Sequence, residues 1–187
     1  MSVPPGTVAM LLRRCPRLIN LVLHGGGNSL SRFHVILNSL NNLTHLKYLS
    51  VDPALFFQTR FVHLPDTSAF HRVTHLDLTT HWAWDIIVGG VQYLHCLTHL
   101  SMTWKISRMV THSLQALLRR QTFKMILLWL DEIDGHQRVI RKLLEWRLDD
   151  PRIVLLRRAS KWAMELGGGC WLHAERIIAW REENNSK

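Results

Sequence analysis

A pattern of four apolar-leaning positions occurs six times along this chain of 187 residues and constrains its fold more than any other feature. The four positions lie at offsets 0, 3, 6 and 8, and the third positions of successive copies are 24 to 28 residues apart. A unit of this size cannot bury its apolar side alone, so copies must stack on one another. The copies are Cys15, Leu18, Leu21, Leu23; Leu43, Leu46, Leu49, Val51; Phe70, Val73, Leu76, Leu78; Leu94, Leu97, Leu100, Met102; Thr122, Met125, Leu128, Leu130; and Leu148, Pro151, Val154, Leu156.

The last six residues of each copy match the L-x-x-L-x-L core of a leucine-rich repeat, whose period of about 20 to 29 residues covers every interval. The fold predicted is α/β, a leucine-rich-repeat-like solenoid forming a single domain over residues 1–187. About six parallel strands should line its concave face, with helices or irregular segments on the convex face. We expect strand cores near 18–23, 46–51, 73–78, 97–102, 125–130 and 151–156.

Between the strand cores the apolar period changes from 2 toward 3.6, which predicts helices over about 31–39, 109–119 and 136–147, a weaker one over 84–88, and one leading into the first strand. Gly167 to Gly169 then break the chain. After this break an apolar stripe of Trp171, Ala174, Ile177, Ile178 and Trp180 predicts a C-terminal capping helix over 171–183. The end repeat of a solenoid exposes its core unless such a segment covers it, so we expect Trp171 and Ile178 to pack over the last strand.

The composition predicts a soluble protein of a reducing compartment, cytoplasmic or nuclear. Hydrophobic residues make up 47% and the mean hydropathy is +0.00, as in globular domains. The densest apolar run, Met125 to Leu130, is far shorter than the roughly 20 residues a membrane helix needs. The three cysteines, Cys15, Cys96 and Cys170, have neither a zinc spacing nor a disulfide framework.

A formal charge of +9 raises the alternative of a nucleic-acid or other polyanion binder. The basic residues are spread over the segments between strand cores, where solvated helix faces account for them. No aromatic and basic stacking motif of an RNA-binding module accompanies them. The alternative therefore remains open but ranks second.

Side chains that flank the inward-pointing third position should form a concave binding face. On it His75 should lie beside His99, with Tyr48 on the other side of His75 and Asp77 one step along the strand. Ile153 and Leu155 should extend the apolar end of this face, unless a loop or the tail covers it. The predicted partner-binding residues are Tyr48, Ser50, Asp52, His75, Asp77, His99, Ser101, Leu127 and Trp129.

The sequence predicts no catalytic residue, cofactor or metal, and so no enzyme. Motifs of the kinds G-x-S-x-G, H-E-x-x-H and the phosphate-binding P-loop do not occur. His75, His99 and Asp77 could in principle ligate zinc. Residues on neighbouring strands project in parallel rather than converging, however, which argues against a metal there.

The chain resembles the leucine-rich-repeat regions of divergent basidiomycete F-box proteins. The resemblance rests on the LTHL and VTHL lead-ins, the segment 150–154 with its Asp-Pro-Arg-Ile-Val sequence, and the closing Trp162, Gly167 to Gly169, Trp171, Ala174, Glu175, Ile177 and Ile178 pattern. It implies a non-enzymatic module that holds a protein for ubiquitination by a cullin-based (SCF-type) ligase. No F-box-like segment precedes the first repeat, so we expect an unidentified protein partner, no direct binding to the cullin adaptor, and no membrane association.

Overall fold

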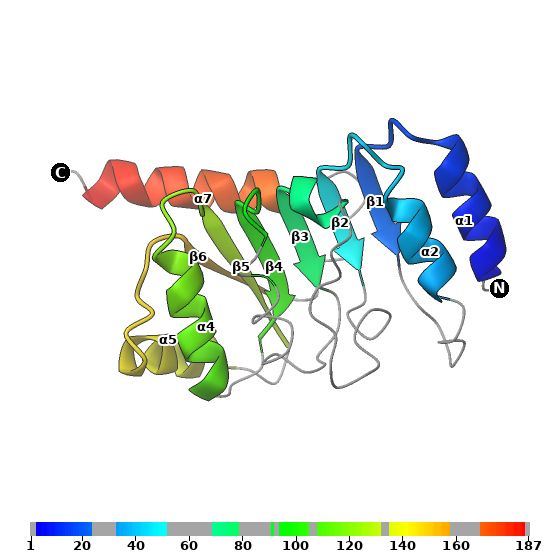
Figure 1. Ribbon diagram of the computed structural model, residues 1–187. Coiled ribbons are helices and arrows are strands. Elements are labelled where there is room, and N and C mark those ends of the chain that lie inside the picture. The colour runs from blue at the N-terminus through cyan, green and yellow to red at the C-terminus, as the bar shows by residue number, and fades with distance from the viewer. Residues whose placement is uncertain are drawn as a thin grey trace.

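The described residues form an α/β structure around one parallel sheet of six strands, whose spatial order follows the chain from β1 to β6 (Figure 1). The computed structural model describes residues 3–23, 33–51, 69–78, 91, 94–104, 108–131, 135–157 and 169–185. The strands are β1 (Asn20–Leu23), β2 (Tyr48–Val51), β3 (His75–Leu78), β4 (His99–Thr103), β5 (Met125–Leu130) and β6 (Ile153–Arg157). Six strand cores were expected from the repeated pattern, and each holds a strand.

Helices lie on both sides of this sheet. They are α1 (Pro5–Arg14), α2 (Phe33–Leu40), α4 (Arg108–Leu118), α5 (His136–Glu145) and α7 (Gly169–Asn185), with one 3-10 turn, η3 (Phe70–Arg72). The helices predicted over 31–39, 109–119, 136–147 and 171–183 are confirmed to within a few residues. The helix predicted over 84–88 falls outside the described residues. Within the described segments no helix is both long and apolar enough to cross a bilayer.

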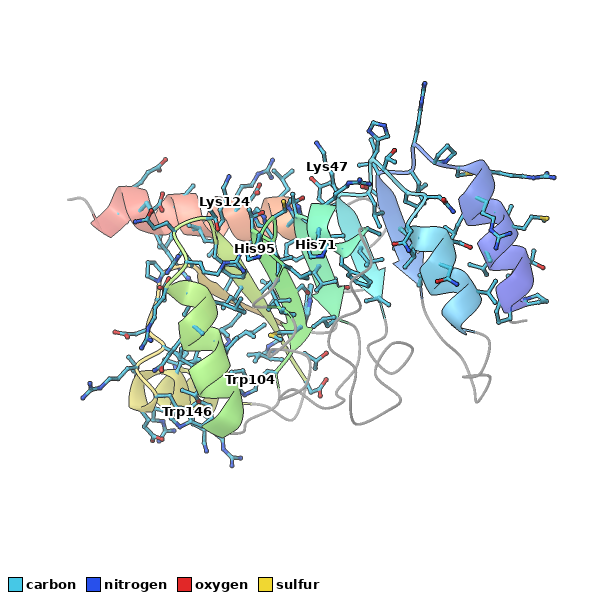
Figure 2. All side chains as sticks on the ribbon, in the orientation of Figure 1. Lys47, His71, His95, Trp104, Lys124 and Trp146 are labelled. Atoms are coloured by element: carbon cyan, nitrogen blue, oxygen red, sulfur yellow. The ribbon has the colours of Figure 1, made fainter. Side chains whose placement is uncertain are left out.

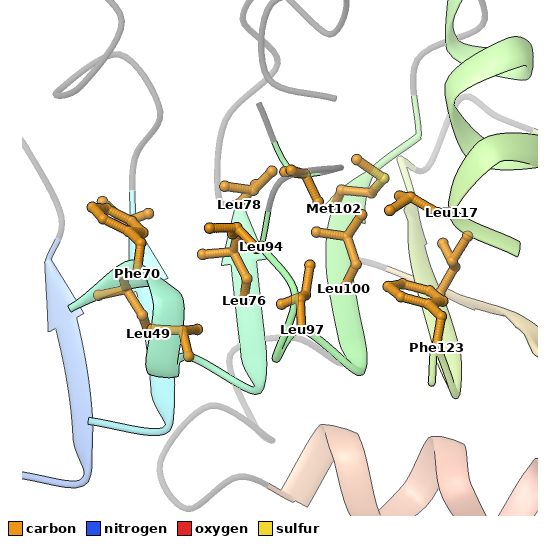
Figure 3. Packing of buried hydrophobic residues seen from close by; sticks show 14 of the residues in the cluster. Leu49, Phe70, Leu76, Leu78, Leu94, Leu97, Leu100, Met102, Leu117 and Phe123 are labelled. Atoms are coloured by element: carbon orange, nitrogen blue, oxygen red, sulfur yellow. The ribbon is translucent and has the colours of Figure 1, made fainter. Parts of the chain in front are cut away.

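The larger apolar core lies between the sheet and α2, α4 and α5. It consists of the inward-pointing residues of each strand, such as Leu76 and Leu100, which are stacked in rows across neighbouring strands (Figure 3). Phe70 and Phe123 come from the turns before β3 and β5 and fill the space between rows. Because strand side chains alternate between faces, these apolar residues occupy every second position of β1 to β4.

The repeat register is confirmed from β1 to β4 and shifted by two residues at β5. Leu21, Leu49, Leu76 and Leu100 occupy equivalent positions, as the pattern predicts. Leu100 then pairs with Ile126, not with Leu128. A shift of two residues keeps every side chain on its expected face, so Leu128 and Leu130 still point into the larger core.

The prediction for β6 is wrong by one residue, which exchanges its two faces. Ile153 pairs with Ile126 and is buried in the larger core, and Leu155 packs against that core as well. Val154 and Leu156, which were expected there, lie on the opposite face. Four successive apolar residues occupy 153–156, so the alternation that identifies the inner face is missing from this strand.

Helix α7 packs on the opposite face of the sheet from α2, α4 and α5. Trp171 and Ala174 of α7 form a second, smaller core with Val154 of β6 and with Met125, Leu127 and Trp129 of β5. In Figure 1, α7 crosses the sheet from β3 to β6 and continues beyond it. The predicted C-terminal helix is therefore confirmed, and it packs on a face of the sheet that includes β5 as well as the last strand.

Candidate functional site

Three aromatic rings form a continuous row across β2, β3 and β4, on the face of the sheet that α7 crosses. Tyr48, His75 and His99 are paired by strand register. The ring centroids of Tyr48 and His75 are 4.2 Å apart, and those of His75 and His99 are 4.0 Å apart with only 5° between the planes. The predicted neighbourhood of these three residues is confirmed. Parallel strands with equivalent residues at the same position stack them in this way.

A second row of polar side chains runs parallel to the first, two residues further along the strands. Asp77 accepts hydrogen bonds from Ser50 Oγ at 2.8 Å and from Ser101 Oγ at 2.6 Å. Ser101 Oγ in turn accepts the indole N–H of Trp129 at 2.7 Å. These bonds pair the carboxylate with its neighbours on both adjacent strands.

Four of the nine predicted partner-binding residues are buried on the face that α7 crosses. His99, Ser101, Leu127 and Trp129 are each less than 5% exposed, although they lie on the predicted face. Tyr48, Ser50, His75 and Asp77 are half-buried. Asp52 lies outside the described residues. The expectation that the apolar end is open is therefore wrong, because Trp171 and Ala174 fill the space above Leu127 and Trp129.

Ile153 and Leu155 do not belong to this face at all. Both point into the larger core, as the one-residue shift of β6 requires. Val154 and Leu156 take their place beneath α7. The apolar end of the face is thus an internal contact between β5, β6 and α7.

The Nδ1 atom of each histidine is in hydrogen-bond contact with the hydroxyl of the threonine that precedes it. Thr74 Oγ1 is 2.9 Å from His75 Nδ1, and Thr98 Oγ1 is 2.7 Å from His99 Nδ1. The same hydroxyls also reach backbone carbonyl oxygens of the preceding strand segment, Lys47 O at 3.3 Å and Thr74 O at 3.1 Å. The sequence did contain this signal, because the lead-ins VTHL and LTHL place a threonine directly before both histidines.

Helix α7 adds two residues that the sequence did not assign to the site. The ring of Trp171 meets both imidazoles edge-on, with centroid distances of 5.3 Å to His75 and 5.8 Å to His99. Glu175 follows one helical turn later, and its Oε1 is 3.3 Å from His99 Nε2. Sequence spacing puts Trp171 and Glu175 on one side of the helix, but nothing local indicates which strands that side meets.

Both imidazoles are shifted toward the neutral form. Burial, the neighbouring His99 and the charge of Lys124 lower the pKa of His75 to about 3. Burial also lowers the pKa of His99, against the opposing effect of Glu175. Two neutral imidazoles therefore face one carboxylate at physiological pH.

The side chains of His75, His99 and Glu175 are close enough to bind one small ligand together. Nitrogen atoms of His75 and His99 and a carboxylate oxygen of Glu175 lie within 4.8 Å of one another. Within the described part of the chain this is the one group of three histidine, cysteine or acidic side chains so arranged. The carboxylate of this group comes from Glu175 of α7, whereas the set weighed and disfavoured from the sequence contained Asp77.

A separate hollow of about 350 Å³ lies between the end of α4 and the turn after α5. Its charged lining includes Arg119, Arg147, Asp149 and Asp150. Asp150 is engaged by Arg152 at 2.7 Å.

Comparisons with known proteins leave the family open. No family model, no curated protein and no solved structure matches the chain.

Proposed function

We propose that this chain is a non-enzymatic protein-recognition module, a leucine-rich-repeat-like solenoid that resembles the substrate-binding region of an F-box receptor. The observation that carries the proposal is the division of one sheet face into a covered and an open part. Over β4 to β6 the face is buried beneath α7, whereas on β1 Asn20 is exposed and Val22 is 55% exposed. An exposed strand face of this kind suits a macromolecular partner better than a small substrate.

The partner surface proposed is the open strip formed by β1 and β2. It contains Asn20, Val22, Tyr48 and Ser50, which strand register places in two adjacent pairs. Val22 lies beside Ser50, and Tyr48 beside Asn20, so the strip offers apolar and aromatic contact with polar neighbours, as recognition surfaces do. Trp129, which the sequence predicts to be a partner-binding residue, is instead buried and supports this face of the sheet from inside the molecule.

A comparison of two exposed valines tests this surface. Val22→Glu places a charge in the open strip, whereas Val35→Glu places the same charge on α2, where Val35 is 40% exposed. Proximity labelling in cells with each variant should lose specific proteins only for Val22→Glu. The proposal fails if both variants recover the same proteins as the wild type, or if the cullin adaptor is retained without any F-box-containing protein.

Polyanion binding is the second candidate, and a specific row of charges favours it. Exposed basic residues precede four of the six strands, β1, β2, β3 and β5, at the amino-terminal edge of the sheet: Arg17, Lys47, Arg72 and Lys124. Figure 2 shows Lys47, His71, His95 and Lys124 spread along the sheet on this side. The charged groups there would contact phosphates rather than protein surface.

Salt dependence separates the two candidates. Binding to phosphates releases counterions, so the affinity for a polyanion should fall steeply as the salt concentration rises. Recognition through Val22 and Tyr48 should survive the same increase in salt. Lys47→Gln with Lys124→Gln should abolish polyanion binding and leave protein recognition intact.

A further inference from the structure

We propose that His75, His99 and Glu175 form a site for a divalent transition-metal ion of the zinc class. The ion would be bound by Nε2 of each histidine and by the Glu175 carboxylate, with water completing its coordination. Two imidazoles and one carboxylate, with one position open to solvent, form a ligand set that zinc accepts. This inference stands independently of the partner surface on β1 and β2.

The positions of the ligand atoms support the site. The ligand atoms lie within 4.8 Å of one another, and His99 Nε2 is 3.3 Å from Glu175 Oε1. Nδ1 of each imidazole faces a threonine hydroxyl, which leaves Nε2 for the ligand. The Glu175 side chain is 51% exposed, so water and a metal ion can reach the site from its side.

The two threonines supply the outer contacts that metal-binding histidines require. Histidine ligands almost always donate their second ring N–H to a neighbouring oxygen, which holds the ring and its tautomer in place. Thr98 Oγ1 can accept the Nδ1 proton of His99 while donating its own proton to the carbonyl oxygen of Thr74 at 3.1 Å. Thr74 can do the same between His75 and the carbonyl oxygen of Lys47.

Metal binding at Nε2 fixes the tautomer of His99, whose two ring nitrogens face Glu175 and Thr98. Without metal, His99 can donate its Nε2 proton to Glu175. With metal, the imidazole changes tautomer and its proton moves to Nδ1, facing Thr98.

Binding should change the local geometry in a defined way. The imidazoles are now 5° from parallel, and their lone pairs run side by side. Zinc to nitrogen distances of about 2.0 to 2.1 Å require the lone pairs to converge, so the rings must tilt out of the stack. The metal would then join β3, β4 and α7, holding the helix over the sheet.

Two charges face the site with opposite effects. Glu175 favours a cation, and the positive charge of Lys124, which acts on both histidines, disfavours one. Removing the lysine charge should therefore strengthen metal binding. A site produced by unrelated surface histidines would not respond in this way.

The test is a titration of the EDTA-treated full-length protein with Zn²⁺ by calorimetry, repeated with Co²⁺ by absorption. We expect one ion per chain, a Co²⁺ spectrum without a sulfur-to-cobalt band, and a higher melting temperature with metal. Glu175→Gln and His75→Gln should weaken binding more than tenfold, and Thr98→Val by about 10- to 100-fold. Lys124→Gln should tighten it, and His95→Gln, an exposed histidine elsewhere, should not change it.

Glu175 is the decisive position, because its exposed side chain can be replaced without disturbing the fold. Equal Zn²⁺ affinity for the wild type and Glu175→Gln would overturn the proposal. So would the absence of saturable Zn²⁺ binding in the folded wild type, or a Co²⁺ spectrum dominated by thiolate ligation.

Discussion

Arg181, near the end of α7, donates from Nη1 to the backbone carbonyl oxygen of Ile153 at 2.8 Å and to that of Pro151 at 3.1 Å. The carbonyl of Arg152, between them, accepts from Ile126 on β5. Successive carbonyls of a strand point in opposite directions, so the carbonyl of Ile153 faces away from β5, toward the outer edge of the last described strand. Unpaired edge groups promote association between chains, and the guanidinium of Arg181 covers one of them.

Arg181→Ala should therefore destabilise the protein by about 0.5 to 1.5 kcal/mol and increase its tendency to self-associate. Urea denaturation and light scattering measure the two effects. Arg176→Ala is the matched control, because Arg176 is exposed on the same helix. Equal behaviour of the two variants would mean that Arg181 does not protect the edge.

Ending the chain at Gly169 removes the helical cover of the smaller core. Leu127, Trp129 and Val154 are fully or almost fully buried, and Trp171 and Ala174 pack against them. We expect the truncated chain to bind a hydrophobic dye, to aggregate and to lose stability. A soluble monomer with an unchanged free energy of unfolding would contradict the observed packing.

Leu100→Ala should cost about 2 to 5 kcal/mol, because it opens a cavity in the middle of the larger core. Leu100 is completely buried between the rows of β3 and β5. Leu144→Ala is the control, since Leu144 is 55% exposed on α5. Chemical denaturation should separate the two variants by more than about 1.5 kcal/mol, and a smaller difference would argue against this register.

Ser101→Ala should destabilise the protein more than Ser50→Ala, although both serines donate to Asp77. Ser101 is buried, and its loss leaves both the Asp77 oxygen and the Trp129 indole N–H without this partner. We expect a loss of about 1 to 3 kcal/mol for Ser101→Ala and about 0.5 to 1.5 kcal/mol for Ser50→Ala. Indistinguishable urea midpoints at equal slope would show that the indole bond adds nothing.

The pair of Asp150 and Arg152 should make stability depend on pH in the acid range. Burial alone would raise the pKa of Asp150, but hydrogen bonds from the side chain and backbone of Arg152, together with its charge, outweigh burial and lower it below 3.8. The unfolded chain then binds the proton more readily, so stability is complete above the ordinary pKa and is lost as pH falls through the lowered one.

The stability difference between wild type and Asp150→Asn should accordingly be largest near neutral pH and shrink below about pH 4. Asp149→Asn, an exposed neighbour, is the control for a general loss of negative charge. Unfolding free energies measured over this range check the prediction. A constant difference at every pH would contradict it.

Local sequence was sufficient to predict most of the sheet. In β1 to β4 apolar and polar residues alternate, as in Leu76 and Leu78 with His75 and Asp77 between them. Alternation identifies the inner face, and a constant spacing between copies then places equivalent residues side by side. The row of Tyr48, His75 and His99 follows directly from these two features.

Where alternation is absent, the same reasoning fails. Residues 153–156 are all apolar because β6 is covered on both faces, by the larger core and by α7. A strand buried on both sides has no polar positions to reveal its orientation. For this reason the sequence assigned Ile153 and Val154 to the wrong faces of β6.

The sequence by itself determined the number of strands, their order and which residues of β1 to β4 point inward, because local spacing and side-chain alternation are properties of the chain alone. Only the tertiary structure decided where α7 lies. An apolar stripe through Trp171, Ala174, Ile177 and Ile178 indicates which side of the helix docks, although Trp180, also predicted for this stripe, is exposed, and the stripe does not indicate which strands it meets. The contact of Glu175 with His99 joins residues far apart in the chain, and it exists only because packing of Trp171 and Ala174 against β5 brings that side of α7 onto the sheet.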